Sequence, residues 1–267
     1  MLLDEKAVLV TGSGGGLGEG IARVCHREGA TVVVADIRGN EAQRVAQSLG
    51  NRALAIECDV GHDADLDRLV AMSVGKFGRI DGLVNNAGVN FVKPFLETTS
   101  DDWDRVIRVD LRGAFFLTQK VCRQMLEQTP GGGSIVNIAS VHTHAALPGS
   151  GPYDAAKWGL VGFGKSIAVE LAAQDIRVNA ISPGLLDTQI WQQIQAAAPD
   201  PAACSEYWKS NIPIERVIEP EEIGELAAFL LSDRSRAITG ANIMADGGMT
   251  SQLISKEPYR SKPIEVN

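Results

Sequence analysis

The sequence of 267 residues predicts an α/β fold: a doubly wound parallel sheet with helices on both faces. Short β-branched runs alternate with stretches of helical periodicity along most of the chain, as repeated βαβ units require. The runs are also nearly continuous in apolar residues, which is typical of strands that a parallel sheet buries on both faces. Because no long linker, internal repeat or low-complexity tract interrupts this rhythm, we expect a single domain over residues 1–267.

Seven runs are predicted to form the strands of the sheet. In chain order they are AVLVTG, TVVVAD, RALAIECD, GLVNNAG, SIVNIAS, IRVNAISPG and ANIMADGG. Two regions depart from the alternation. Residues 185–219 contain several prolines, so we expect two short helices with a break between them. Residues 250–267 show no periodicity, and we expect this C-terminal tail to be either disordered or held against a neighbouring subunit.

Composition and charge narrow the classes of partner. Lysines and arginines number 25 against 33 aspartates and glutamates, a net charge of −8, which argues against nucleic acid or an anionic membrane as the main partner. The four cysteines are scattered without a CxxC pair, which is typical of buried thiols in a reducing compartment. The first residues, MLLDEK, lack the apolar core of a signal peptide, and no apolar run approaches the roughly 20 residues of a membrane span. We therefore expect a cytoplasmic protein without a membrane segment.

A glycine-rich turn joins the first predicted strand to the first predicted helix. Gly12, Gly16 and Gly18 would let the backbone approach a pyrophosphate closely at the N-terminus of that helix, although a purely structural turn would use the same residues. Asp36 ends the next strand, close to the roughly 20-residue spacing expected for an acid that binds the ribose hydroxyls of a dinucleotide. Its carboxylate would repel a 2′-phosphate, which predicts NAD rather than NADP, while Arg38 could pair with such a phosphate. Asp36 could otherwise cap the following helix.

Tyr153 and Lys157 form a candidate catalytic pair. At i and i+4 they project from one face of a helix, one turn apart. A free tyrosine has a pKa of about 10, and a nearby ammonium group favours the phenolate, so such a pair can supply a general base for an alcohol or a general acid for a carbonyl. Ser140, after the preceding strand, could hold the substrate oxygen by a hydrogen bond. The same pair on a surface helix would merely be solvated, so the glycine turn and Ser140 decide in favour of catalysis.

Six short motifs occur in order along the chain: Thr11-Gly12-x-x-x-Gly16-x-Gly18, CDV at 58–60, NNAG at 85–88, Ser140 with YxxxK at 153–157, SPGLLDT at 182–188 and DGG at 246–248. Together they resemble the short-chain dehydrogenases/reductases. The resemblance implies a Rossmann-type fold, an NAD or NADP cofactor, and hydride transfer between a secondary alcohol and a carbonyl in a small-molecule substrate. It also implies that Lys157 holds the nicotinamide ribose. The cofactor contacts that it implies are Gly12, Ser13, Gly16, Leu17, Gly18, Asp36, Ile37, Asp59, Val60, Asn86, Ala87, Gly88, Tyr153, Lys157, Pro183, Gly184, Leu186 and Thr188.

Asp110 departs from the pattern of this family. The family commonly has an asparagine here, and the resemblance implies that this residue helps to order a water near the catalytic lysine. We place Asp110 in the catalytic site with Ser140, Tyr153 and Lys157, where the change affects the proton relay rather than the reaction class. A structural acid paired with a neighbouring arginine is the alternative, and both interpretations stay open.

The candidate substrate contacts lie near the predicted mouth of the site. His142 follows the fifth strand, whose end should face the ligand, although it could equally be a loop histidine bonded to backbone. Residues 185–219 follow the nicotinamide loop, where a substrate lid would form, and they contain Trp191 and Trp208. A tryptophan in a short helix can also be packed core. His142 and His144 have no convincing third ligand, so we expect no metal.

The expected substrate is a sugar, polyol or related hydroxy compound, because SVH after the fifth strand resembles sugar and polyol dehydrogenases of the family. The main alternative is a carbonyl reductase of 3-oxoacyl thioesters or cyclic ketones, which a more hydrophobic lid would favour. A non-catalytic NAD(H)-binding sensor or scaffold is a third interpretation, against which the presence of Tyr153 and Lys157 argues. The resemblance also implies a homotetramer or homodimer, with helices near 101–128 and 151–173 at the interfaces.

Overall fold

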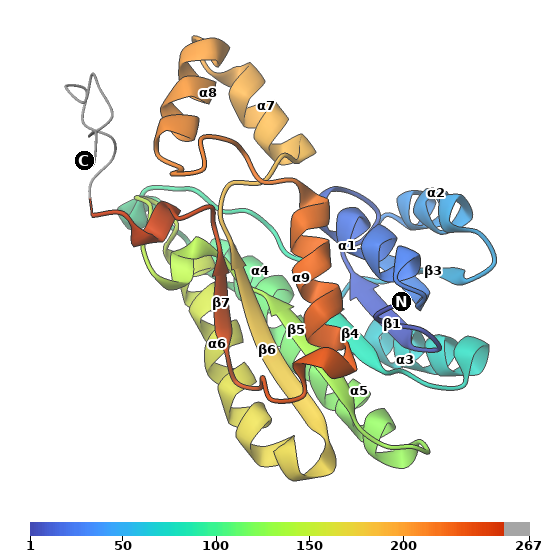
Figure 1. The fold of residues 1–267 in the computed structure, drawn as a ribbon. Coiled ribbons are helices and arrows are strands. Elements are labelled where there is room, and N and C mark those ends of the chain that lie inside the picture. The colour runs from blue at the N-terminus through green and yellow to red at the C-terminus, as the bar shows by residue number, and fades with distance from the viewer. Residues whose placement is uncertain (254–267) are drawn as a thin grey trace, which may run out of the picture.

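Within residues 1–253, the seven predicted strands form one parallel sheet (Figure 1). These are the residues that the structure, a computed structural model, describes, so the predictions for 254–267 lie outside them. The strand order is β3-β2-β1-β4-β5-β6-β7. Their bounds are β1 Ala7–Thr11, β2 Thr31–Asp36, β3 Ala53–Glu57, β4 Gly82–Asn85, β5 Gly133–Ile138, β6 Ile176–Pro183 and β7 Asn242–Ala245. The predicted doubly wound α/β fold is confirmed.

The helices cover both faces of this sheet (Figure 1). One layer consists of α1 (Gly16–Arg27), α2 (Gly39–Leu49) and α9 (Pro220–Leu231), and the other of α3 (Asp63–Phe77), α5 (Ala114–Glu127) and α6 (Gly151–Leu171). Successive residues of β1 point to opposite layers: Val8 and Val10 pack with the first, and Leu9 packs with the second. All of them are at most 1% exposed, which explains why the strand sequences are apolar throughout rather than alternating.

The stretch predicted as one helix over 101–128 is not regular. Helix α4 (Ser100–Ile107) passes through a π-helical turn at Arg108–Gly113 into α5. Such turns are rare and often lie at functional sites. Asp110 is in the turn and is buried, so the irregularity places a carboxylate in the interior.

The carboxyl ends of the strands form the edge where a ligand site is expected. From β1 to β3 each new strand is added on one side of β1, and from β4 to β7 each new strand is added on the other side. The order of strand addition therefore reverses between β1 and β4, while all strands remain parallel. Ligands of open α/β sheets bind outside the carboxyl ends at such a reversal.

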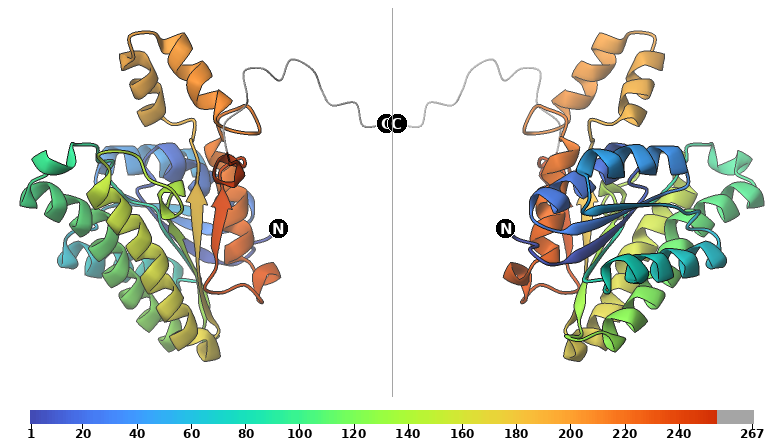
Figure 2. Two further views of the ribbon diagram at one scale, coloured as in Figure 1. Left: turned by 90° about the vertical axis from the view of Figure 1, so that its left-hand side faces the viewer. Right: turned by 90° about the vertical axis from the view of Figure 1, so that its right-hand side faces the viewer.

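Two short helices stand above this edge, apart from the layers that cover the sheet (Figure 2). They are α7 (Gln189–Ala197) and α8 (Pro201–Ser210), and they match the two helices predicted within 185–219. The break between them ends at Asp200, whose side chain caps α8 by accepting two backbone N–H groups, while Pro201 occupies its first position. Among the helices of residues 1–253, none has the length and apolar character needed to cross a membrane.

Candidate active site

The glycine-rich turn between β1 and α1 has the backbone geometry of an anion site. Gly12 and Gly16 have φ angles of +63° and +53°, in the left-handed region that favours glycine. A Cβ atom at Gly18 would lie 2.2 Å from the carbonyl oxygen of Gly12, so the turn closes this tightly only with glycine there. The N-cap residue Gly15 provides no side-chain cap, which leaves the first N–H groups of α1 available to a ligand. The turn therefore fits a pyrophosphate.

Asn86 fastens this turn to the end of β4. Its side-chain amide donates to the carbonyl oxygens of Thr11 at 2.9 Å and Gly12 at 3.0 Å. In return, Thr11 Oγ1 accepts the backbone N–H groups of Asn86 at 3.0 Å and Ala87 at 3.1 Å. The motifs that follow β1 and β4 thus hold each other in place, whatever ligand they also contact.

Asp36 places a buried carboxylate beside the turn. It is 5% exposed, and its Oδ2 accepts the backbone N–H of Gly14 at 2.9 Å. Its Oδ1 accepts the backbone N–H of Arg38 at 2.9 Å, and the Arg38 side chain donates to the same atom at 3.2 Å. Because the N-cap of α2 is Arg38, the interpretation of Asp36 as a helix cap is wrong. The guanidinium of Arg38 is already paired with Asp36, so a 2′-phosphate would have to compete with the Asp36 carboxylate for it.

These groups line a cleft of about 770 Å³ at the carboxyl edge of the sheet. Nearly all predicted cofactor contacts line it: Gly12, Gly16, Leu17, Gly18, Asp36, Ile37, Asp59, Val60, Asn86, Ala87, Gly88, Tyr153, Lys157, Pro183, Gly184, Leu186 and Thr188. Ser13 does not, because its fully buried hydroxyl donates to the carbonyl of Val10 at 2.7 Å and accepts the N–H of Ala35 at 3.1 Å. The Ser13 side chain joins the turn to β1 and β2, and it does not face the ligand.

Tyr153 and Lys157 lie near the start of α6 and line the same cleft. The Nζ atom of Lys157 is 5.3 Å from the centre of the Tyr153 ring and donates to the carbonyl of Ile138 at 3.2 Å. Lys157 is 5% exposed, so its charge acts on its neighbours with less solvent screening than a surface lysine would. Ser140, just beyond β5, is 7% exposed and also lines the cleft. The structure thus brings the predicted catalytic side chains together.

Asp110 enters this cleft from the π-helical turn. Its Oδ1 accepts the backbone N–H of Val89 at 2.7 Å, and its Oδ2 lies 3.7 Å from Nζ of Lys157. Burial raises the pKa of the Asp110 carboxyl, and the Lys157 ammonium opposes this by favouring the charged form. The ion pair of Asp110 is with a lysine, so the alternative of an acid paired with a neighbouring arginine is wrong.

The predicted substrate contacts differ in their positions. Trp191 is 5% exposed and lines the cleft. Trp208 lies behind it, edge-on, with the ring centres 6.1 Å apart, and is not part of the cleft lining. His142 is also outside the lining: its Nδ1 lies 2.5 Å from Oδ1 of Asp154, and its ring packs edge-on against Tyr153 at 5.2 Å. The ring of His142 is therefore bonded to a side chain, in place of the bond to backbone that was the alternative.

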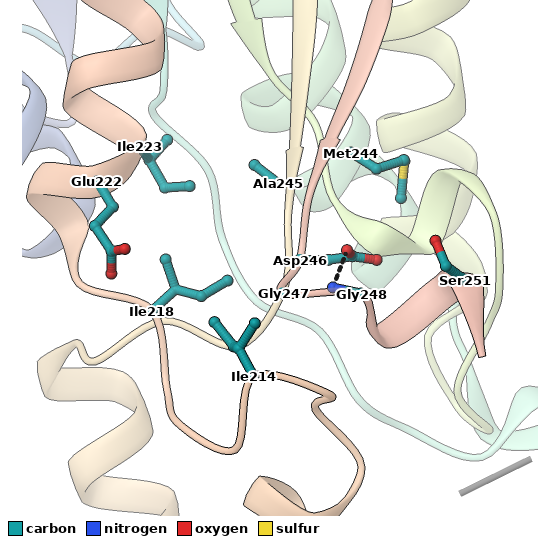
Figure 3. A pocket seen from close by; sticks show the side chains of 10 residues that line it. All are labelled: Ile214, Ile218, Glu222, Ile223, Met244, Ala245, Asp246, Gly247, Gly248 and Ser251. Carbon is teal, nitrogen blue, oxygen red and sulfur yellow. Dashed lines mark hydrogen bonds between the residues drawn. The ribbon is translucent and has the colours of Figure 1, made fainter. Parts of the chain in front are cut away.

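Another hollow, of about 410 Å³, lies beside the end of β7 (Figure 3). Its lining is mostly apolar, and the polar side chains in it are those of Glu222, Asp246 and Ser251. The other lining residues are Ile214, Ile218, Ile223, Met244, Ala245, Gly247 and Gly248. Its acids are already bound within the chain, since Glu222 pairs with Arg216 at 2.6 Å and Asp246 accepts the N–H of Gly248 at 2.9 Å. The groups suited to catalysis therefore lie in the larger cleft. In the described part of the chain, no three His, Cys, Asp or Glu side chains are grouped so that they could hold a metal ion.

Comparisons with known proteins agree with this geometry. A family model described as enoyl-(acyl carrier protein) reductase matches residues 12–250. Dehydrogenase/reductase SDR family member 4 of Sus scrofa is 36% identical over 255 residues, which cover 94% of this chain and 89% of that protein. The chain belongs to the short-chain dehydrogenase/reductase family. It is accordingly an NAD(P)-dependent oxidoreductase, and the glycine turn, Asp36 and the cleft between them fit a dinucleotide.

Two solved structures are similar over almost their whole length. A 3-ketoacyl-(acyl-carrier-protein) reductase from Brucella melitensis, complexed with NADH, is 33% identical with a TM-score of 0.84, covering 93% of this chain and 99% of that one. A candidate gluconate dehydrogenase from Agrobacterium tumefaciens is 32% identical with a TM-score of 0.87, covering 94% and 98%. Both support the fold and the oxidoreductase class of this family member, while their names point to different substrates.

Several cleft residues were not predicted from the sequence. Ile190 and Ile194 line the cleft on either side of Trp191, and their i, i+4 spacing on a predicted helix was the available signal. Arg105 and Arg108 line it from α4 and the π-helical turn, and Arg108 pairs with Asp59 at 3.2 Å. No local pattern distinguishes these arginines from surface ones, because their position depends on the irregular helix.

Proposed function

We propose that this enzyme uses NAD to interconvert a secondary alcohol and a carbonyl compound, with Tyr153 as the residue that moves the proton. The observation that carries the proposal is the meeting of Tyr153, Lys157 and Ser140 in a cleft that also contains the glycine turn and Asp36. A hydride acceptor and a proton acceptor are the two components that this reaction needs, and the cleft is suited to both.

The proposed roles follow from the positions of the side chains. When bound, the nicotinamide accepts or returns the hydride. In oxidation, the Tyr153 phenolate takes the hydroxyl proton of the alcohol, and in reduction the phenol gives its proton to the carbonyl oxygen. The buried Lys157 ammonium favours the phenolate and would hold the nicotinamide ribose. The Ser140 hydroxyl donates to the substrate oxygen and holds it beside Tyr153.

The preference for NAD is proposed from Asp36, and Asp36→Ser tests it. The variant loses a charge-assisted hydrogen bond to the ribose hydroxyls, worth about 1.5–3 kcal/mol, so kcat/KM with NAD should fall roughly tenfold or more. With NADP it should rise, because the repulsion of the 2′-phosphate is gone and the Arg38 guanidinium is freed from its partner. Initial rates with both cofactors give the ratio. Asp101→Asn, on the exposed start of α4, should leave that ratio unchanged, and an unchanged ratio in Asp36→Ser itself would contradict the assignment.

For the substrate, the lid favours a compound with an apolar part. Helix α7 contributes Ile190, Trp191 and Ile194 to the cleft, and burying apolar substrate surface against them is favourable. This supports a 3-oxoacyl thioester or cyclic ketone over the sugar or polyol expected from the sequence, in line with the similarity to the ketoacyl reductase. A sugar or polyol is the second candidate, since Trp191 suits the C–H face of a sugar ring and the candidate gluconate dehydrogenase is equally similar.

A panel of initial rates decides between these candidates. NADH-dependent reduction of 3-oxoacyl thioesters and cyclic ketones is compared with NAD-dependent oxidation of aldoses, polyols and sugar acids, under otherwise identical conditions. We expect the highest kcat/KM in the reduction set. Turnover confined to polyhydroxy compounds would establish the second candidate instead. Binding of NADH without turnover of any alcohol or carbonyl would overturn the proposed function.

We also propose that the enzyme is a cytoplasmic homotetramer or homodimer that pairs through α5 and α6. Exposed apolar side chains on these helices support this, with Phe115, Trp158 and Val169 exposed by 38%, 55% and 83%. Trp158 and Val169 share one face of α6, which a second copy would cover. The four cysteines are free thiols, as is typical of a reducing compartment. Light scattering of the purified protein tests the assembly.

A further inference from the structure

Within the described residues, one carboxylate oxygen of the active site has no hydrogen-bond partner. Asp110 is 1% exposed, and only its Oδ1 is bonded, to the N–H of Val89. Its Oδ2 is buried without a hydrogen bond and lies 3.7 Å from Nζ of Lys157, too long for a hydrogen bond but within ion-pair range. Burying a carboxylate with one oxygen that lacks a hydrogen bond costs folding free energy. The attraction between Asp110 and Lys157 is the main interaction that offsets this cost.

The same ammonium also faces Tyr153. Three groups surround Nζ of Lys157: the Ile138 carbonyl at 3.2 Å, Oδ2 of Asp110 at 3.7 Å and the Tyr153 ring at 5.3 Å. An anion that close to the ammonium weakens the field that the ammonium exerts on other groups around it. Asp110 and the Tyr153 phenolate therefore compete for one positive charge.

Burial and two nearby cations act in opposite directions on the charge of Asp110. Carboxyl groups ordinarily lose their protons several pH units below phenols. Burial raises the pKa of Asp110, but Lys157 from α6 and, more weakly, Arg105 from α4 both favour its charged form. The segment after β4 contributes the neutral N–H of Val89. On the side of Tyr153, the other titratable groups are His142, edge-on to its ring, and Asp154, bonded to His142.

We propose that Asp110 opposes phenolate formation at Tyr153 by sharing the Lys157 ammonium, so that this enzyme keeps its catalytic proton to higher pH than the same site with a neutral residue at 110. The inference rests on the proposed function of Tyr153. It assigns to Asp110 an effect, exerted through Lys157, on whether Tyr153 gives or takes the proton at a given pH. Carbonyl reduction, which uses the protonated phenol, should proceed at neutral pH, whereas alcohol oxidation should rise toward alkaline pH.

Spectroscopic titration of Tyr153 tests the inference without substrate. The chain contains three tyrosines, so subtracting the titration of Tyr153→Phe from each tyrosinate absorbance curve isolates Tyr153. In Asp110→Asn, the midpoint of tyrosinate formation should fall by about one pH unit. Asp110→Ser removes the same charge with a smaller side chain, and it should shift in the same direction. Asp104→Asn, an exposed carboxylate of α4, is the matched control and should not shift.

The outcomes separate this inference from the proposed function. An unchanged midpoint in both Asp110 variants would show that the carboxylate only anchors the Val89 amide, and the inference would fail. A shift to higher pH would overturn it too, because Asp110 would then help Tyr153 by keeping Lys157 charged. If the midpoint falls but no alcohol or carbonyl is turned over, the electrostatic coupling stands and the proposed function fails.

Discussion

Tyr153→Phe should lower kcat by about 10²- to 10⁴-fold in either direction, because it removes the group that carries the proton. The fold of the site should survive the change. Tyr153 packs against an apolar cluster that includes Phe91 and Ala156, and its ring meets His142 edge-on. Phenylalanine keeps the ring and therefore these contacts. The expected result is an enzyme that binds NADH almost as well as the wild type and has lost the chemical step.

Initial rates from NADH absorbance measure the loss, and NADH fluorescence measures cofactor affinity in the same preparations. Tyr207→Phe is the matched control, since Tyr207 is 65% exposed on α8 and outside the cleft lining. It should retain the wild-type kcat. If Tyr153→Phe kept more than about a tenth of the wild-type kcat, a different group would have to move the proton, because the expected loss is far larger.

The features that could be predicted from the sequence are those contained in a short window. The glycine turn depends on a few neighbouring residues between a strand and a helix, and the structure has it there with Gly12 and Gly16 at positive φ. The same holds for Tyr153 and Lys157, because an i, i+4 pair shares a helix face wherever the helix packs. The apolar strands predicted the sheet for a similar reason: burial on both faces leaves a local record in composition.

Contacts between distant segments could not be predicted in this way. The family resemblance placed Asp110 near Lys157, but the periodicity gave no sign of the π-helical turn in which Asp110 lies or of its ion pair with the lysine. The bond between His142 and Asp154 joins the two ends of a loop whose path no local rule determines. The lid over 185–219 combines a predicted and an unpredicted feature. Its two helices were expected from the sequence, but the cleft contacts of Ile190 and Ile194 on α7 were not.

Gly18→Ala should weaken NADH binding by roughly a hundredfold or more and cost about 1–3 kcal/mol of stability, because a methyl group is forced into a packed turn. The added Cβ would lie 2.2 Å from the carbonyl oxygen of Gly12 and 2.5 Å from the amide nitrogen of Asn86. Neither neighbour can move freely. The Asn86 amide holds the carbonyls of Thr11 and Gly12, so making room for the methyl group breaks the clamp between β1 and β4.

Gly75→Ala provides the matched control for this substitution. Gly75 lies inside α3, and a Cβ added there would meet nothing within 4 Å. Replacing a glycine within a helix by alanine should stabilise the fold by about 0.5–1 kcal/mol and leave NADH binding unchanged. Fluorescence titration with NADH and thermal unfolding of both variants compare a methyl group inside the turn with one outside it. Equal NADH affinity in the two variants would mean that the turn after β1 does not hold the cofactor phosphates, and the cofactor would have to be placed elsewhere in the cleft.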